Sequence, residues 1–156
     1  MKKNEKKYQV RSRSLLEFID KSPTPFHAVK TLKDQLQKAE YVELYEHEEW
    51  KLSPGGQYFV VRNGSSLVAF SVGSEKPQDS GFKIIGAHTD SPNLRLKPNP
   101  TYVKNGYVQL GVEVYGGALL STWTDRDLSL AGRVIQRVTN KKSSKTVTKQ
   151  PALRLN

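Results

Sequence analysis

His88 and Asp90 are the residues of this sequence whose types and spacing best suit chemistry. They stand two positions apart, so at the exit of a β-strand both side chains can point to the same side. A neutral imidazole can ligate a metal while a neighbouring carboxylate orients it. The pair therefore predicts a metal-ligating histidine with an acidic partner behind it. The alternative is a histidine at a strand-to-loop corner followed by an N-capping aspartate, which is the commoner role of an isolated His-x-Asp.

The residues before His88 predict the strand that would position it. Ile84 and Ile85 belong to a short apolar run, and Gly86 and Pro92 bound the polar tip that follows. Such a run between turn signals is typical of a buried strand. We therefore expect His88 at a strand end, where ligand sites of α/β folds are usually found.

The rest of the chain predicts the elements around that strand. Apolar spacing indicates helices over residues 14–20 and 24–39, the second capped by Thr24. Asn63 and Gly64 are typical of a hairpin turn. Runs of β-branched and aromatic residues indicate strands at residues 41–44, 57–62, 67–72, 107–115 and 133–138. Helices combined with these strands favour an α/β layer with a mixed sheet.

Three blocks of the sequence resemble, in order, the M18 family of aspartyl aminopeptidases. Residues 86–98 (GAHTDSPNLRLKP) resemble the block around the family's first metal-binding histidine, and residues 22–29 (SPTPFHAV) resemble its N-terminal signature. Residues 111–120 and 123–133 resemble the segment that follows the histidine. The resemblance extends over about residues 15–138, and three long ordered blocks make it specific.

This resemblance implies a zinc-dependent aminopeptidase that removes N-terminal Asp or Glu from peptides and forms a homo-oligomer. By resemblance, His88 ligates one of two zinc ions and Asp90 is a catalytic residue that orients it. The family's bridging aspartate, base glutamate and remaining ligands lie in later motifs that these 156 residues lack. Because zinc sites use three or four protein ligands, we expect the chain to be inactive alone.

The resemblance also implies a division into domains within an α/β fold. Residues 1–13 are expected to be a basic tail, and residues 14–98 the N-terminal part of a zinc aminopeptidase-like mixed-sheet domain. Residues 99–156 would then be the truncated, β-rich start of an inserted dimerisation domain. Within it, residues 139–150 are polar and lysine-rich without apolar periodicity, which predicts a mobile loop.

Other candidate residues have ordinary explanations. His27 lies near the start of a predicted helix, and His47 lies in an acidic run typical of a solvated surface. Asp125 and Asp127 flank Arg126, which suits an ion-paired turn as well as catalysis. We assign none of these a catalytic role.

Composition limits the compartment and the partners. The chain has no cysteine, which excludes disulfides and thiolate metal sites and fits a reducing compartment. It has neither a signal-peptide pattern nor an apolar run long enough to span a bilayer, so we expect a cytoplasmic protein without a membrane partner. The net charge of +10 is concentrated in residues 1–13 and 133–156. Basic ends without a central basic stripe make nucleic acid an unlikely partner.

Two functions of other classes remain as alternatives. The chain could be a non-catalytic product that associates only through its dimerisation strands. A nucleic-acid binder with basic tails is the least favoured, and it would lose binding as salt rises.

Overall fold

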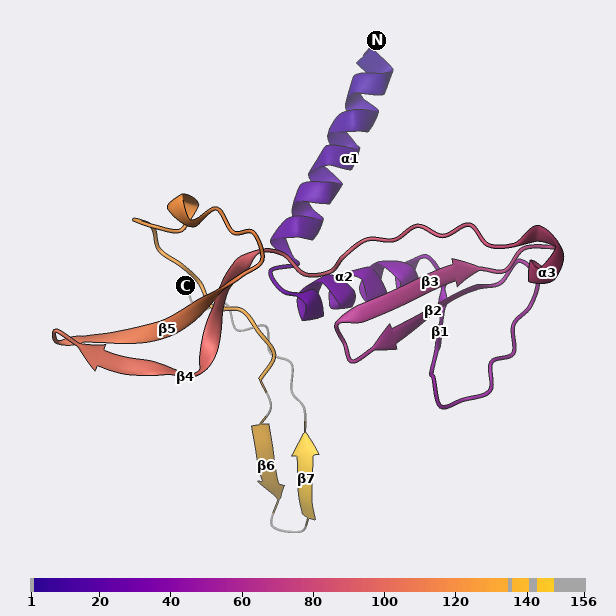
Figure 1. Cartoon of the computed structure of the whole chain (residues 1–156). Helices are drawn as coiled ribbons and strands as arrows, with labels where there is room; N and C mark the ends of the chain where they lie inside the picture. Colours follow the sequence, from indigo (N-terminus) through magenta and orange to yellow (C-terminus); the bar gives the residue numbers. More distant parts are fainter. Residues whose placement is uncertain (1, 135, 141–142, 148–156) are drawn as a thin grey trace.

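The computed structural model describes residues 2–134, 136–140 and 143–147 (Figure 1). Its elements in chain order are α1 (Lys2–Asp20), α2 (Pro25–Lys38), β1 (Val42–Leu44), β2 (Gln57–Arg62), β3 (Ser66–Ser71), α3 (Pro77–Ser80), β4 (Asn93–Lys104), β5 (Tyr107–Tyr115), a 3-10 turn at Leu120–Thr122, β6 (Gln136–Asn140) and β7 (Ser143–Val147). The strands form one sheet in the order β1-β2-β3 and two separate hairpins, β4-β5 and β6-β7. No helix in the described part of the chain is long and apolar enough to cross a membrane.

Helix α2 forms as its sequence predicts. The Thr24 side chain accepts a hydrogen bond from the His27 amide, and Pro25 occupies the first turn, where its missing N–H costs nothing. The helix buries Ala28 and Val29. Lys33 on α2 pairs with Glu43 on β1, with 2.7 Å between Nζ and Oε1. The predicted cap and helix are therefore confirmed, and α2 is joined to the sheet.

The three-stranded sheet supplies most of the interior. β1 runs parallel to β2, and β3 runs antiparallel to it, so the predicted mixed sheet is confirmed. The turn between β2 and β3 places Asn63 at φ 53° and Gly64 at φ 68°, the left-handed conformations that this turn type requires. β2 is the central strand and contributes three buried residues in a row, Tyr58, Phe59 and Val60. The described core is consequently small and is formed by this strand together with Ala28 and Val29 of α2.

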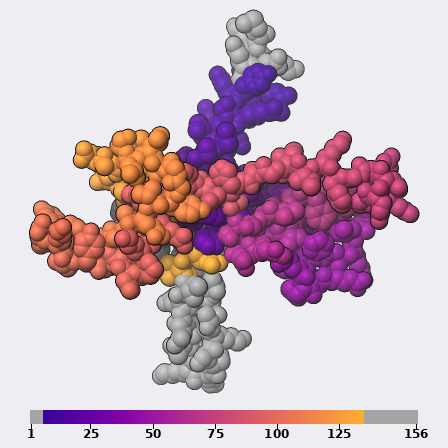
Figure 2. Space-filling view, viewed as in Figure 1, coloured from indigo at the N-terminus to yellow at the C-terminus, as the bar shows by residue number. Residues whose placement is uncertain are grey.

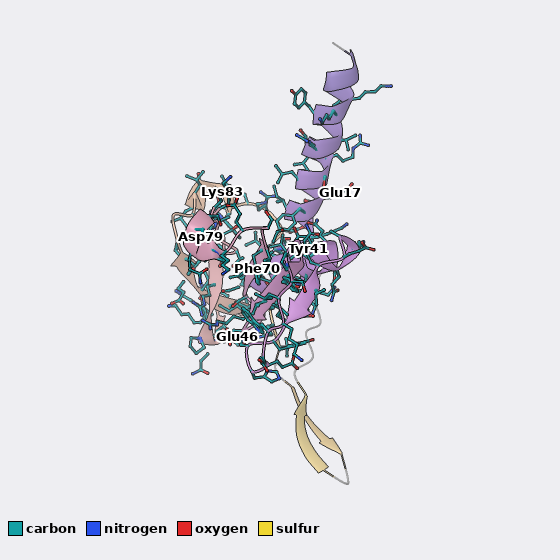
Figure 3. All side chains as sticks on the ribbon, turned by 90° about the vertical axis from the view of Figure 1, so that its right-hand side faces the viewer. Glu17, Tyr41, Glu46, Phe70, Asp79 and Lys83 are labelled. Carbon is teal, nitrogen blue, oxygen red and sulfur yellow. The ribbon has the colours of Figure 1, made fainter. Side chains whose placement is uncertain are left out.

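Helix α1 is longer than the sequence predicts. It begins at Lys2 and runs through Ser14, so Ser14 is not a cap and the basic residues 6–13 are helical. Lysine, arginine and glutamate have favourable helix propensities, so a charged segment can continue a helix that apolar spacing marks only at its end. In Figure 2, α1 projects from the body of the molecule, and Figure 3 shows its side chains pointing outward around the helix.

The predicted strand before His88 is absent. Residues 81–92 form no ladder, and the Ile85 side chain is 98% exposed. Figure 1 draws this stretch as a long irregular connection from α3 to β4. An apolar run favours a strand only where a neighbouring strand accepts its backbone hydrogen bonds, and no described strand pairs with it. The prediction of a buried strand is therefore wrong for the described residues.

The hairpin β4-β5 is long and mostly exposed. The prediction of a strand over residues 107–115 is confirmed. Its partner β4 continues through position 98 without a break, although the register of the pairing shifts between Leu96 and Thr101. The sequence-based domain boundary at 98 stays a prediction, but β4 forms one continuous strand there. The hairpin places Tyr115 opposite Asn93, three residues after Asp90.

Near the C-terminal end, two strands occur where the sequence predicts a loop. β6 and β7 pair antiparallel from Gln136 opposite Val147 to Asn140 opposite Ser143. The predicted strand over 133–138 is thus shifted toward the C-terminus, and much of the predicted loop over 139–150 is strand. Val, Thr and other β-branched residues favour this conformation in spite of the lysines. Positions 141–142 and 148–150 of that predicted loop lie outside the described residues.

Candidate functional site

His88 and Asp90 lie together, as the sequence predicts. His88 Nδ1 is 2.6 Å from the Asp90 carbonyl oxygen and 3.4 Å from Asp90 Oδ1. Because a carbonyl can only accept, the geometry requires the proton on Nδ1 and leaves the lone pair on Nε2. The His88 side chain is 79% exposed. This is the orientation in which an imidazole can offer Nε2 to a metal.

Two side-chain hydrogen bonds hold this segment to the rest of the molecule. Thr89 Oγ1 donates to the carbonyl oxygen of Ser65, in the turn between β2 and β3, at 2.8 Å. Tyr115 Oη, at the end of β5, donates to Asp90 Oδ2 at 2.6 Å. The first bond ties the segment to the sheet and the second ties it to the hairpin. The irregular stretch is thereby attached to both elements immediately after its metal-ligand candidate.

The carboxylate of Asp90 is stabilised in its charged form. The hydrogen bond from Tyr115 is the largest cause that lowers the pKa of Asp90, and a backbone hydrogen bond and the neighbouring His88 act in the same direction. The same hydrogen bond, together with the charge of Asp90, raises the pKa of the Tyr115 phenol. Both directions follow because a hydrogen bond to a carboxylate favours the ionised acceptor and the protonated donor.

The described residues do not hold a zinc ion by themselves. Across 2–134, 136–140 and 143–147, no group of three or more His, Cys, Asp or Glu side chains is placed to bind a metal. His88 fits as one ligand, but three or four protein ligands are needed for stable zinc sites. The pair also lies outside two hollows of about 570 and 690 Å³, whose linings include neither residue.

The remaining candidates have structural roles. His27 Nδ1 lies 2.7 Å from Thr24 Oγ1 at the start of α2, and burial followed by the charge of Lys30 lowers the pKa of its ring. His47 is exposed beside Glu48. Asp125 adopts φ 52° in an exposed stretch, and the neighbouring Arg126 donates to the Thr122 carbonyl oxygen. In the described part of the chain, no hydrogen bond or ion pair joins any of these residues to the His88–Asp90 pair.

Sequence reasoning missed Tyr115. It stands 25 positions after Asp90, and only the pairing of β4 with β5 brings its hydroxyl to the carboxylate. Gly116 assists, because its φ of 69° turns the chain and its backbone packs against Pro92. The available signal was Asn105-Gly106, which forms the two-residue turn between β4 and β5, but the irregularity between Leu96 and Thr101 shifts the pairing that this turn sets.

Comparisons with known proteins place these features in context. The family model described as "Aminopeptidase I zinc metalloprotease (M18)" matches residues 18–155. A "Probable M18 family aminopeptidase 2" of Pseudomonas paraeruginosa is 51% identical over 142 residues, which cover 91% of this chain and 33% of the relative. The structure of Chaetomium thermophilum mApe1 is similar with a TM-score of 0.75 and 45% identity, over 92% of this chain and 32% of that one. The S. cerevisiae mApe1 dodecamer has a TM-score of 0.74 and 34% identity, over 83% of this chain and 30% of that one.

The chain thus spans about one third of the length of these relatives. The match extends from helix α1 past the β4-β5 hairpin, and it confirms both the resemblance found in the sequence and the α/β fold class. Because the family model covers most of the sequence, this chain belongs to the M18 family of aminopeptidases, which are zinc metalloproteases.

Proposed function

We propose that this chain contributes His88 and Asp90 to the active site of a zinc aminopeptidase that removes N-terminal Asp or Glu from peptides. The observation that carries the proposal is the His88 ring, exposed and fixed by the Asp90 carbonyl so that Nε2 is left as a ligand atom. Asp90 is proposed as the orienting carboxylate because Oδ1 faces the same ring nitrogen. Membership of the M18 family supports the reaction class.

The preference for acidic residues is a finer part of the proposal. It is supported by the likeness of residues 86–98 and 111–133 to aspartyl aminopeptidase blocks. A cytoplasmic location belongs to the same proposal, because a chain without cysteine fits a reducing compartment.

We further propose that the 156 residues are inactive alone. The described residues offer a single imidazole at the site and no cluster that could complete a metal centre. One ligand cannot hold zinc against water. The other ligands, and the group that activates water, would be supplied by polypeptide corresponding to the remaining two thirds of the relatives.

A chimaera tests this proposal. Residues 1–156 would be joined to the part of the Pseudomonas paraeruginosa relative that follows the matched region. We expect zinc-dependent cleavage of Asp- and Glu-p-nitroanilide in preference to Leu-p-nitroanilide, and none by residues 1–156 alone. His88→Ala should lower kcat/KM at least about 100-fold, since even partners behind a metal ligand are typically worth 10- to 100-fold.

The matched control is His47→Ala, because His47 is also highly exposed and its ring nitrogen lies beside Glu48. This variant should retain full activity. Cleavage of the leucine substrate in preference to the acidic ones would refute the specificity. An active His88→Ala chimaera would refute the assignment of His88 to the site. Zinc-dependent hydrolysis by the 156 residues alone would refute their proposed inactivity.

A homo-oligomer formed through the β4-β5 hairpin is a second proposal, because one face of that hairpin is apolar and exposed. Val108, Leu110, Val112 and Val114 alternate along β5, and all four are exposed. Exposed apolar strands favour association. The dodecameric S. cerevisiae relative supports an oligomer in this family. Light scattering should show a concentration-dependent mass that falls with Val108→Glu, whereas a strictly monomeric chain would contradict the proposal.

A further inference from the structure

The Asp90 carboxylate is shared between two elements of the structure. Its Oδ2 accepts a 2.6 Å hydrogen bond from Tyr115 at the end of β5, and its Oδ1 faces His88 Nδ1 at 3.4 Å. Its own carbonyl oxygen is 2.6 Å from that ring nitrogen. The phenol, the carboxylate and the imidazole therefore form a continuous row from the hairpin to the exposed ring.

The register of the hairpin fixes the position of the phenol. Tyr115 is paired with Asn93, the first residue of β4, which follows Asp90 by three positions. Gly116 turns away immediately, with the position of its missing Cβ only 3.5 Å from the Pro92 backbone. A Cβ there would make only ordinary van der Waals contact with Pro92, but any residue with a side chain would be strained at the φ of 69° that Gly116 adopts. The backbone thus holds the Tyr115 ring beside the segment that carries the metal-ligand candidate.

The segment has few other means of holding its geometry. Residues 81–88 are exposed and form no ladder, and the contact of Thr89 with Ser65 fixes the backbone but not the Asp90 side chain. An exposed aspartate samples several rotamers unless a partner selects one. Among the described side chains, Tyr115 makes the shortest hydrogen bond to this carboxylate, and by donating it stabilises the negative charge that faces His88.

We propose that Tyr115 is a positioning residue of this site, whose hydroxyl holds Asp90 so that His88 keeps its proton on Nδ1 and its lone pair on Nε2. The inference deepens the proposed function, because that tautomer is the one able to ligate through Nε2. Its test reads the imidazole directly and requires neither zinc nor catalysis. Failure of the aminopeptidase assignment would therefore leave the result interpretable.

The experiment is long-range ¹H–¹⁵N NMR of the ¹⁵N-histidine-labelled full chain at pH 8. His47, which is 80% exposed with its Nε2 3.8 Å from Glu48 Oε1, serves as an internal comparison. We expect His88 to be enriched in the Nδ1–H tautomer relative to His47. Tyr115→Phe, which removes one oxygen and keeps the ring, should lower the Nδ1–H to Nε2–H ratio of His88 by about threefold, the order of magnitude expected for losing a partly exposed hydrogen bond.

Two further variants keep the test decisive. Tyr107→Phe changes a tyrosine at the opposite end of β5 and should leave the ratio unchanged. Asp90→Ala removes the carboxylate that Tyr115 holds but keeps the main-chain carbonyl and Tyr115, so it should lower the ratio at least as much, and adding Tyr115→Phe to it should have no further effect. A wild-type His88 indistinguishable from His47, an unchanged ratio in Tyr115→Phe, or additive effects of the two substitutions would each overturn the proposal.

Discussion

Replacing Phe59 with alanine should remove much of the stability of the β1-β2-β3 sheet. The Phe59 side chain is 0% exposed at the centre of β2, between Glu43 on β1 and Ala69 on β3 in the ladder. Removing a buried phenyl group costs about 3–5 kcal/mol of unfolding free energy, through lost transfer energy and the cavity that remains. Only five hydrophobic side chains are buried in the described part of the chain, so few neighbours can compensate.

The assay is urea unfolding followed by the fluorescence of Trp50. The Trp50 ring stacks on Phe70 with 6.3 Å between centroids, and Phe70 in turn lies 5.6 Å from Tyr58, so the indole reports on this sheet. In Figure 3, Phe70 lies within the body of the molecule. Trp123→Phe leaves Trp50 as the only tryptophan. With a slope of about 1–3 kcal/mol per molar urea, the midpoint should fall by at least about 1 M, or the sheet should be unfolded without denaturant.

Val68→Ala is the matched control, because Val68 lies on the adjacent strand β3 and is 64% exposed. Its cost should stay below about 1 kcal/mol, the range of strand propensities. Equal midpoints for Phe59→Ala and Val68→Ala would refute the reasoning, since they would mean that the described interior does not hold the sheet together.

Two further predictions concern the start of α2. Thr24→Ala removes the oxygen that accepts a hydrogen bond from the His27 amide, and it should lower the free energy of unfolding in urea by about 1 kcal/mol. Thr24→Ser keeps a hydroxyl and should lower it by less than half of that. Equal losses for the two variants would exclude a capping role. Burial lowers the pKa of His27 in the folded state, so the unfolded state binds a proton on this ring more readily. The stability that depends on a neutral His27 is therefore complete above about pH 6.5 and is lost as the pH falls through the lower folded pKa. His27→Gln should flatten the dependence of the urea midpoint between pH 7.5 and 5, and an unchanged slope would contradict this.

Local signals predicted much of the fold. Thr24 with Pro25 marks the start of α2, and Asn63 with Gly64 marks the hairpin turn, because each depends on backbone conformations that neighbouring residues determine. The strand before His88 was not predictable in the same way. Its apolar run is present, but a strand also needs partners elsewhere in the chain, and Ile85 instead lies exposed.

The site was predictable only in its local part. His88 and Asp90 are only two positions apart, so their contact could be predicted from the sequence without knowledge of the fold. Tyr115 joins them through the register of the β4-β5 hairpin, and the irregularity between Leu96 and Thr101 shifts that register away from the one that the Asn105-Gly106 turn sets. The long α1 was missed for a different reason: its charged residues carry helix propensity without the apolar period that sequence reasoning used.

The geometry of His88 therefore depends on two separate pieces of the fold. Thr89 attaches the segment to the sheet turn at Ser65, and Tyr115 attaches it to the β4-β5 hairpin, while residues 81–88 contribute no ladder of their own. A ligand that binds only the ordered segment stabilises every contact that orders it. Zinc binding in a complete M18 site should accordingly strengthen the junction between sheet and hairpin as well as the ring itself. Because this coupling is reciprocal, loosening either attachment should weaken zinc binding even when His88 is unchanged.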